Sequence, residues 1–337
     1  MILVIGAAGH IGNVLVRELT RRGQKVRALV LPGEDCSPLS DSKTEIVEAN
    51  ILDYPSLKKA MEGVDVVFHL ASLVALVPAQ FELMRKVNID GTVNVIRACQ
   101  ETGIKRLIYT SSIHAYGHPD KSLVIDETLP FDTENRNGSY DQTKAKASEL
   151  VSQAARDGLN AVLLAPTGVI GPYDYKRSEM GEMTHYWMKA LPTFTLDGAY
   201  DFVDVRDVVE AHINAIEQGV AGEAYILPGH RLTVREYRRL VQEASGERGT
   251  ELYIPTKFAR LFAPIAEWVY RLTKTRPRFT RYSLDTLMSN SVISNNKAAE
   301  ALSYRVRPMT ETVKDTVWWW KENGKMLKPT VRNASPS

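Results

Sequence analysis

Three features of the 337-residue sequence predict an α/β fold with a doubly wound parallel sheet. A short apolar run at 2–5 leads into a glycine-rich turn and then into a helical pattern. Further apolar runs alternate with helical segments through the first half of the chain, which is the pattern of βαβ units. The run at 65–72 is almost continuously apolar, as expected for a parallel strand that is covered on both faces.

The turn after the first apolar run has a spacing that suits dinucleotide binding. It reads Gly6-Ala7-Ala8-Gly9-His10-Ile11-Gly12, a G-x-x-G-x-x-G pattern between a strand and a helix. The first glycine permits a tight turn, the second lets backbone approach a pyrophosphate, and the third allows close helix–strand packing. The N-terminus of the helix also favours an anion. We therefore predict that the cofactor contacts Gly6, Gly9, His10, Ile11 and Gly12.

The end of the second predicted strand, at 25–30, leaves the choice between NAD and NADP open. NAD-binding versions of this arrangement place an acidic residue there to hold the ribose hydroxyls, whereas an arginine accepts a 2′-phosphate. Here the strand runs into Leu31, and the first acids, Glu34 and Asp35, lie beyond the turn. No arginine is placed to accept a 2′-phosphate unless the side chain of Arg27 bends toward the cofactor site. Because the expected acid is absent, we favour NADP over NAD and expect Leu31 to line the cofactor site.

The other strands of the sheet follow in order, separated by helical segments. We predict strands at 45–49, 65–72, 106–110, 161–164 and 223–227, a helix at 56–61 and another that runs from 87–92 through Ala98. Ligands of such sheets bind at the carboxyl ends of the strands. The residues that fall there are Asn50, Ile51, Leu70, Ala71, Ser72, Ser111 and Ser112.

Tyr140 and Lys144 form a Y-x-x-x-K pair in a segment of helical character, 139–152. Four residues make about one helical turn, so the phenol and the ammonium lie on one face. A free tyrosine has a pKa of about 10, and a lysine cation one turn away lowers that pKa by favouring the phenolate. The pair can then move a proton to or from a carbonyl or alcohol oxygen. Such pairs also occur on solvated helices, so the prediction depends on the preceding strands and glycines.

Together these segments resemble the extended short-chain dehydrogenase/reductase family, the NAD-dependent epimerase/dehydratase family, over nearly the whole chain. The resemblance implies a Rossmann-type sheet with a smaller C-terminal substrate-binding lobe. Within the family, the segments 197–204 and 258–282 look closest to the dihydroflavonol-reductase and 3β-hydroxysteroid-dehydrogenase-like group. The motifs that carry the resemblance are the glycine turn, Asp65 to Ser72, Asn88 with Gly91-Thr92, Tyr109 to Ser112 with Tyr116-Gly117, Tyr140-x-x-x-Lys144, Pro166 to Pro172, Phe202 to Val208, Lys297 to Arg305 and Asp315 to Val317.

The resemblance also implies a Ser-Tyr-Lys site. Tyr140 would be the general acid/base, Lys144 would hold the nicotinamide ribose hydroxyls, and Ser112 would hydrogen-bond the reacting oxygen. The cofactor would supply the hydride. We expect His114 and His118, which lie in a loop beside the serine, to be solvated rather than catalytic. The loop that would reach the nicotinamide amide comprises Pro166, Thr167, Gly168 and Val169.

The second half of the chain is expected to build a substrate lobe. The cofactor domain would comprise 1–172, with 201–228 returning to it. The lobe would comprise 173–200 and 229–330, and a polar tail would follow at 331–337.

Local signals within this half predict few regular elements before residue 201. The stretch 173–200 shows no clean period and is rich in aromatic residues, which suits an apolar substrate as well as ordinary packing. Asp204 or Asp207 is expected to cap a helix, and Thr233 with Glu236 predicts a capping box.

The C-terminal region contains a basic amphipathic stretch at 257–281. Such a stretch suits a lid, a subunit interface or a membrane surface. Because Pro264 interrupts the helical spacing, we do not expect membrane contact. A closing helix packed on the core is predicted at 309–321.

The composition is that of an ordinary soluble globular enzyme, with 44% hydrophobic and 24% charged residues. The net charge of +2 gives no reason to expect a nucleic-acid partner. Cys36 and Cys99 cannot form a disulfide framework or a metal cluster, so no metal is expected. Met1 runs straight into an apolar strand without a basic leader, and the chain lacks an apolar window of about 18 residues. We therefore expect a cytoplasmic protein.

These observations predict an NAD(P)-dependent oxidoreductase that interconverts a carbonyl and a secondary alcohol on an apolar small molecule. One alternative is a nucleotide-sugar epimerase or dehydratase, which would need cations for a diphosphate. Another is a non-catalytic NAD(P)-sensing protein. The presence of Ser112, Tyr140 and Lys144 argues against it, because a sensor needs only the glycine turn. The family resemblance further suggests a homodimer through the helices that contain Val95 and Lys144. The candidate cations for a diphosphate are Lys176, Arg177 and Lys189.

Overall fold

The computed structural model of the chain describes residues 1–74, 80–117, 119–120, 122–135, 138–256, 258–259, 281–289 and 291–324. Most of the basic stretch at 257–281 lies outside these ranges, as do His118 and the tail at 331–337.

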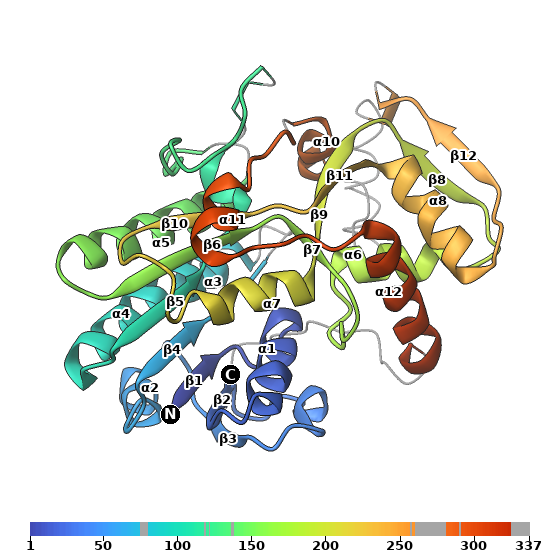
Figure 1. The fold of residues 1–337 in the computed structure, drawn as a ribbon. Coiled ribbons are helices and arrows are strands. Elements are labelled where there is room, and N and C mark those ends of the chain that lie inside the picture. The colour runs from blue at the N-terminus through green and yellow to red at the C-terminus, as the bar shows by residue number, and fades with distance from the viewer. Residues whose placement is uncertain are drawn as a thin grey trace.

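A seven-stranded parallel sheet forms the centre of the molecule (Figure 1), which confirms the predicted fold class. The strand order is β10-β6-β5-β4-β1-β2-β3. The order reverses between β1 and β4, and ligands of such sheets bind outside the carboxyl ends at this switch point. The strands are β1 (Ile2–Ile5), β2 (Val26–Val30), β3 (Glu45–Glu48), β4 (Val66–His69), β5 (Arg106–Thr110), β6 (Ala161–Pro166) and β10 (Ala224–Leu227).

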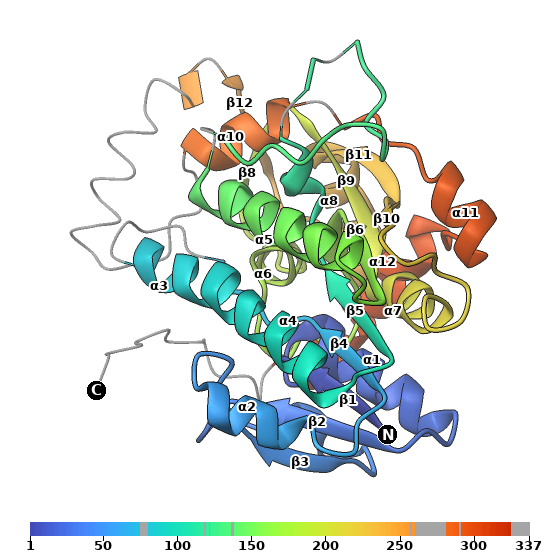
Figure 2. The same cartoon turned by 90° about the vertical axis from the view of Figure 1, so that its left-hand side faces the viewer.

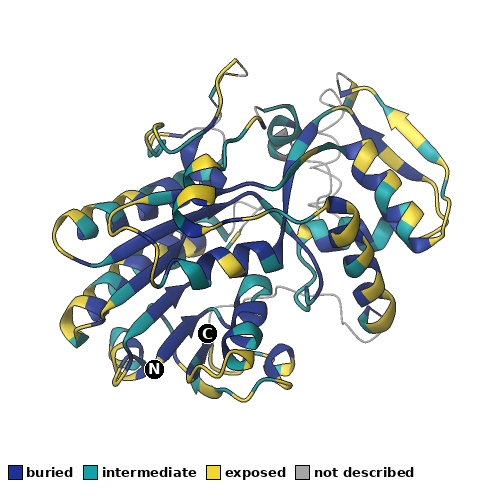
Figure 3. Ribbon diagram, in the orientation of Figure 1, coloured by how far each residue is buried: buried dark blue, intermediate teal, exposed yellow. Residues whose placement is uncertain are grey.

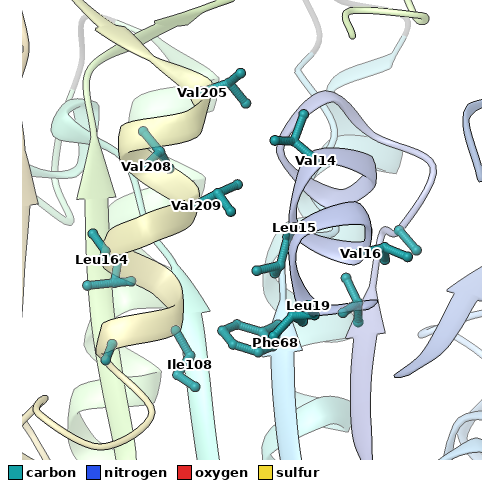
Figure 4. Close-up of a cluster of buried hydrophobic side chains, with 14 of the residues drawn as sticks. Val14, Leu15, Val16, Leu19, Phe68, Ile108, Leu164, Val205, Val208 and Val209 are labelled. Carbon is teal, nitrogen blue, oxygen red and sulfur yellow. The ribbon is translucent and has the colours of Figure 1, made fainter. Parts of the chain in front are cut away.

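Helices cover both faces of this sheet (Figure 2). Successive residues of a strand point to opposite faces, so Ile2 and Val4 join one core cluster and Leu3 and Ile5 join the other. Figure 4 shows the first cluster, in which α1 and α7 lie side by side over the sheet. The helices of the first cluster are α1 (His10–Arg21), α7 (Val205–Asn214) and α11 (Asn296–Leu302), and those of the second are α2 (Tyr54–Ala60), α4 (Gly91–Thr102) and α5 (Ser139–Arg156).

Within the described residues, the lobe combines two small sheets with four helices, along which buried and exposed residues alternate (Figure 3). Trp187, Phe202 and Tyr237 lie in its core together with Val241 and Val317. The sheets have the orders β11-β9-β7 and β12-β8. Their strands are β7 (Gly168–Ile170), β8 (Thr193–Leu196), β9 (Ala199–Asp204), β11 (His230–Thr233) and β12 (Glu251–Ile254), and the helices are α6 (Glu179–Trp187), α8 (Val234–Ser245), α10 (Arg281–Met288) and α12 (Met309–Asn323).

The absence of regular structure expected for 173–200 is wrong, because this stretch contains α6 and β8. The side chain of Ser178 caps α6 by accepting a hydrogen bond from the Gly181 N–H at 3.1 Å. Glu179 and Glu182 lie in the first turn, where carboxylates stabilise the helix dipole. Ser178 followed by these acids was a start signal that the aromatic residues obscured.

The capping predictions are confirmed at both sites. The Asp204 side chain accepts from the Arg206 N–H at 2.7 Å and caps α7, and Thr233 with Glu236 forms the capping box of α8. Arg206 also pairs with Asp315 of α12 at 2.6 Å. Arg206 therefore links α12 to the end of β9, where α7 begins.

The closing helix α12 packs on the lobe core, as the sequence predicted. Trp319 and Trp320 are buried, whereas Trp318 is 62% exposed. None of the helices within the described residues combines the length and apolar content needed to cross a bilayer.

Candidate active site

The glycine turn joins β1 to α1 and leaves no room for a side chain at Gly6 or Gly12. Gly6 has a φ of +84°, and a Cβ there would lie 2.9 Å from the Ala71 nitrogen. At Gly12 a Cβ would lie 2.2 Å from the Gly6 oxygen, so only glycine lets α1 approach the turn this closely. The third glycine of the motif therefore has the packing role that the sequence predicted.

The start of α1 fits the pyrophosphate of a dinucleotide. Gly9 is the N-cap, it provides no side chain to cap the helix, and the first turn contains no acidic residue. The backbone N–H groups and the positive end of the helix dipole are therefore available for an anion. His10 directs its Nε2 to the Pro172 carbonyl oxygen at 2.9 Å, which links the turn to the loop that enters the lobe.

The first acid after β2, Glu34, already has two partners. The Glu34 carboxylate accepts from the Leu31 N–H at 2.9 Å and pairs with the Lys176 ammonium. Leu31 is half exposed. Arg27 does not bend toward this end, because its guanidinium binds Glu45 at 3.0 Å and backbone carbonyls at 60 and 62.

The loop after β4 lies beside the glycine turn, whereas the loop after β3 packs on α4. Leu70 and Ala71 are the backbone neighbours of Gly6. The Asn50 side chain accepts from the Leu52 N–H at 2.9 Å, so it turns back on its own loop. Ile51 is buried against Gly91 of α4.

Asn88 fixes the loop after β4, a role that the sequence analysis did not assign. It lies in a π-helical turn, Lys86–Asp90, between α3 (Phe81–Arg85) and α4. Its Oδ1 accepts from Ser72 Oγ at 3.1 Å and from the Leu73 N–H at 2.8 Å, and its Nδ2 donates to Thr143 at 3.0 Å. The asparagine therefore holds Ser72 against α5. Single π-turns are frequent at functional sites, but no periodic pattern announces them.

Tyr140 lies in the first turn of α5, where Ser112 and Ser72 converge on it. Burial raises the pKa of Tyr140 to about 12, while the nearby hydroxyls of Ser112 and Ser72 act to lower it and the Asp141 carboxylate acts to raise it. Ser112 follows β5, and its Oγ accepts from the His114 N–H at 3.2 Å. Three segments that are far apart in the sequence thus meet at one phenol.

Lys144 is buried one turn after Tyr140, but its ammonium points to other partners. It donates to the Thr110 carbonyl oxygen at 2.7 Å and to the Tyr109 hydroxyl at 3.0 Å. Burial lowers the pKa of Lys144 to about 7. The expectation that Lys144 lowers the pKa of Tyr140 is therefore not borne out, because burial outweighs every group that acts on the phenol.

The loop after β6 is bound to the strands of the lobe. The Thr167 hydroxyl donates to Asp201 at 2.6 Å, and Gly168 begins β7, which pairs with β9 in parallel. A Cβ at Gly168 would lie 2.6 Å from the Tyr200 ring. The segment from Pro166 to Val169 therefore connects the sheet edge directly to the lobe.

His114 is not solvated, contrary to the prediction. Its side chain is 16% exposed, and its ring centroid lies 6.0 Å from that of Tyr140 in an edge-on orientation. The prediction failed because a short 3₁₀ turn, Ile113–Tyr116, folds the histidine back toward α5. Within the described ranges, no three His, Cys, Asp or Glu side chains gather in a way that could hold a metal ion.

Comparison with known proteins identifies relatives along the whole chain. The family model described as the NAD dependent epimerase/dehydratase family matches residues 2–227. Sterol demethylase protein B of Methylococcus capsulatus is 29% identical over 330 residues, covering 96% of this chain and 98% of that protein. The 3β-hydroxysteroid-dehydrogenase/decarboxylase isoform 1 of Arabidopsis thaliana is 30% identical over 339 residues, covering 92% of this chain and 76% of that protein.

Solved structures share the fold. The crystal structure of gox2253 has a TM-score of 0.85 at 30% identity and covers 96% of this chain and 99% of that chain. The dTDP-glucose 4,6-dehydratase DesIV of Streptomyces venezuelae, solved with NAD and TYD bound, has a TM-score of 0.79 at 21% identity, covering 97% and 99%. The chain therefore belongs to the NAD dependent epimerase/dehydratase family and is an NAD(P)-dependent dehydrogenase or reductase of the extended short-chain type.

Proposed function

We propose that the protein interconverts a carbonyl and a secondary alcohol on an apolar small molecule through Ser112, Tyr140 and Lys144. The observation that carries this proposal is the convergence of the Ser112 and Ser72 hydroxyls on Tyr140 at the carboxyl ends of the strands. When bound, the nicotinamide cofactor supplies the hydride.

Tyr140 exchanges the proton with the substrate oxygen through its hydroxyl. A pKa near 12 keeps this hydroxyl protonated at neutral pH, so it is ready to donate to an oxygen that gains charge during carbonyl reduction. Ser112 donates a second hydrogen bond to that oxygen and stabilises its developing charge. The ammonium of Lys144, anchored by Tyr109 and Thr110, holds the ribose hydroxyls of the nicotinamide half.

The relatives support an apolar, ring-containing substrate. The two curated relatives described above carry sterol demethylase and hydroxysteroid dehydrogenase names, and both match the chain over most of its length. A steroid-like ketone has few groups that hydrogen-bond, so its recognition would depend on apolar contacts.

We also propose a preference for NADP over NAD. It is supported by Leu31 at the position where NAD-binding sheets place an acid, and by Lys176 close to the end of β2. Glu34→Gln tests this choice, because it removes a carboxylate that would repel a 2′-phosphate and frees the lysine. NADPH should bind more tightly to the variant while NADH does not; tighter NADH binding or weaker NADPH binding would contradict the preference.

The nucleotide-sugar alternative requires cations that face a diphosphate. Lys176 pairs with Glu34, and Arg177 pairs with Glu182 at the start of α6, so these two cations already have carboxylate partners. The third candidate, Lys189, is exposed just after α6. Uridine and thymidine diphosphates should therefore leave the melting temperature unchanged. A clear rise in the melting temperature would instead favour a nucleotide-sugar substrate.

The direct test of the function is NADPH and NADH binding followed by cofactor oxidation against a panel of apolar ketones, aldehydes and steroid-like or flavonoid-like carbonyls. Turnover on any of these carbonyls is the expected result. Cofactor binding without turnover on the whole panel, combined with protection by a nucleoside diphosphate, would overturn the proposal.

The assembly that we propose is a cytoplasmic homodimer formed through α4 and α5. The two helices lie next to each other on one face of the sheet (Figure 2), and Val93 of α4 is 43% exposed. Sedimentation of the wild-type chain and of Val93→Glu tests the interface, since a buried carboxylate should dissociate the dimer.

A further inference from the structure

Four polar side chains beside Tyr140 form a connected group, which we term the histidine cluster: His114, Asp141, Tyr200 and Tyr282. Asp141 follows Tyr140 in α5, and its side chain is fully buried. Its Oδ1 accepts from the Tyr282 hydroxyl at 2.6 Å and lies 3.5 Å from His114 Nδ1. The other imidazole nitrogen, Nε2, lies 2.8 Å from the Tyr200 hydroxyl.

The fold leaves space for this cluster. The His114 ring stacks on the Tyr200 ring with centroids 6.0 Å apart. A Cβ at Gly168 would lie 2.6 Å from Tyr200, and a Cβ at Gly138 would lie 2.5 Å from Tyr282. Both tyrosines therefore occupy positions that two glycines keep open. His114 and Asp141 belong to the sheet side, whereas Tyr200 of β9 and Tyr282 of α10 belong to the lobe.

The imidazole has partners in either protonation state. In the neutral form, an Nδ1 proton faces the Asp141 carboxylate and Nε2 accepts from the Tyr200 hydroxyl. In the protonated form, both nitrogens donate and the Tyr200 oxygen accepts. His114 can therefore gain or lose a proton without leaving its place next to Tyr140.

Charge on the imidazole acts directly on the phenol. The Asp141 carboxylate disfavours a negative charge on Tyr140, and an imidazolium close to both groups offsets that effect. Among the described residues, the ionisable groups in contact with His114 are Tyr140 and Asp141 of α5, Tyr200 of β9 and Tyr282 of α10. The three tyrosines are neutral at physiological pH, because burial raises the pKa of each of them.

We propose that His114, held by Asp141 and Tyr200, is a positioning residue for Tyr140 whose protonated form stabilises the phenolate left after proton donation. The inference rests on the proposed function. It predicts that carbonyl reduction slows as the pH rises through the range in which the imidazole loses its proton, ordinarily near a pKa of about 6.5. This loss of rate should fall on kcat rather than KM, because the phenolate forms only as the proton is transferred.

The first experiment compares kcat against pH for the wild type, His114→Gln and Asp141→Asn with NADPH and a carbonyl from the panel. His114→Gln should lose the part of the near-neutral fall in kcat (the near-neutral limb) that the imidazole causes, and keep the part that follows Lys144, whose pKa burial lowers to about 7. It should also lose about tenfold in kcat on the acidic side, with KM within about twofold. Asp141→Asn should move the limb to lower pH, because the imidazolium loses its carboxylate. His230→Gln, a partly buried histidine of β11 that is bound to the Arg307 carbonyl, is the matched control and should keep the wild-type profile.

An unchanged limb in His114→Gln overturns the inference while leaving the proposed function intact. Failure of the wild type on every carbonyl contradicts the proposed function instead, and a second measurement then decides the inference. In NMR spectra of ¹³C-histidine-labelled protein, the His114 resonance is identified by its loss in His114→Gln. It should titrate, and Asp141→Asn should lower its midpoint. A resonance that does not titrate, or a midpoint that does not move, overturns the role proposed for the cluster.

Discussion

Two groups of side chains surround Tyr140, and they arise in different ways. Ser72, Ser112 and Lys144, the strand-end group, come from the carboxyl ends of two neighbouring strands and from one turn of α5. The histidine cluster joins residues that are 86 and 141 positions apart across the sheet and the lobe. The first group follows from local motifs and sheet topology. The second depends on packing between lobe and sheet, which no short motif encodes.

The two groups also differ in how they treat charge. The strand-end group contains one basic side chain, Lys144, and burial lowers its pKa to about 7. The histidine cluster places a carboxylate and an imidazole side by side, so its net charge depends on the pH. Substitutions should therefore act on turnover and cofactor binding in the first group and on pH dependence in the second.

The largest predicted effect among the strand-end substitutions follows from Lys144→Met. It should lower kcat/KM by on the order of 10³-fold and weaken NADPH binding, because one ammonium serves both the cofactor and the site. Lys146→Met, two residues along the same helix and partly exposed, is the matched control. Steady-state kinetics and fluorescence titration of NADPH measure the two effects. Lost turnover with unchanged cofactor affinity would contradict the role assigned to Lys144.

Ser112→Ala should have a smaller effect, on the order of 10²-fold in kcat, with NADPH affinity retained. The Ser112 hydroxyl acts to lower the pKa of Tyr140, so its removal should also move the titration of Tyr140 to higher pH. Ser111→Ala removes a neighbouring hydroxyl that bonds Ser148 at 2.6 Å and serves as the control. Equal losses in the two variants would remove the distinction between the adjacent serines.

Much of the strand-end group was predictable from sequence. The glycine turn, the strand ends and the spacing of Tyr140 and Lys144 each carry their own local signal, and sheet topology brings them to one edge. The partners of Lys144 were not predictable, because Tyr109 and Thr110 meet the ammonium only through the packing of α5 on β5. The predicted lowering of the Tyr140 pKa was wrong for a similar reason, because the spacing of two residues does not reveal how deeply they are buried.

The histidine cluster was missed because its signal is spread over four elements. His114 stands in a segment rich in turn residues, which favours a solvated interpretation. In the folded structure, Gly138 and Gly168 leave room for two tyrosines of the lobe to pack against the histidine. Neither glycine has a positive φ, so neither marks a tight turn that would draw attention in the sequence.

The smallest predicted effect concerns stability and a buried histidine beneath the strand-end group. His212 donates from Nδ1 to the Val208 carbonyl at 2.7 Å, and its Nε2 lies 2.8 Å from Thr110 Oγ1. Burial lowers the pKa of His212 to about 4, below the ordinary value of 6.5. The unfolded chain therefore binds the proton first as the pH falls, and stability is lost between pH 6.5 and about 4.

His212→Gln should flatten this acid dependence by up to about 1.4 kcal/mol per pH unit, although the variant is less stable at neutral pH. Urea unfolding of both proteins across this range measures the two slopes. Parallel slopes would show that His212 does not remain neutral in the folded chain.

The central claim is that the Tyr140 hydroxyl moves the proton to or from the substrate oxygen, and Tyr140→Phe tests it most directly. The measurement combines NADPH affinity with turnover of one carbonyl that the wild type reduces. We predict a loss in kcat of on the order of 10³-fold with NADPH affinity within about twofold, because the ring stays and only the proton donor is removed. Turnover at the wild-type rate would contradict the account.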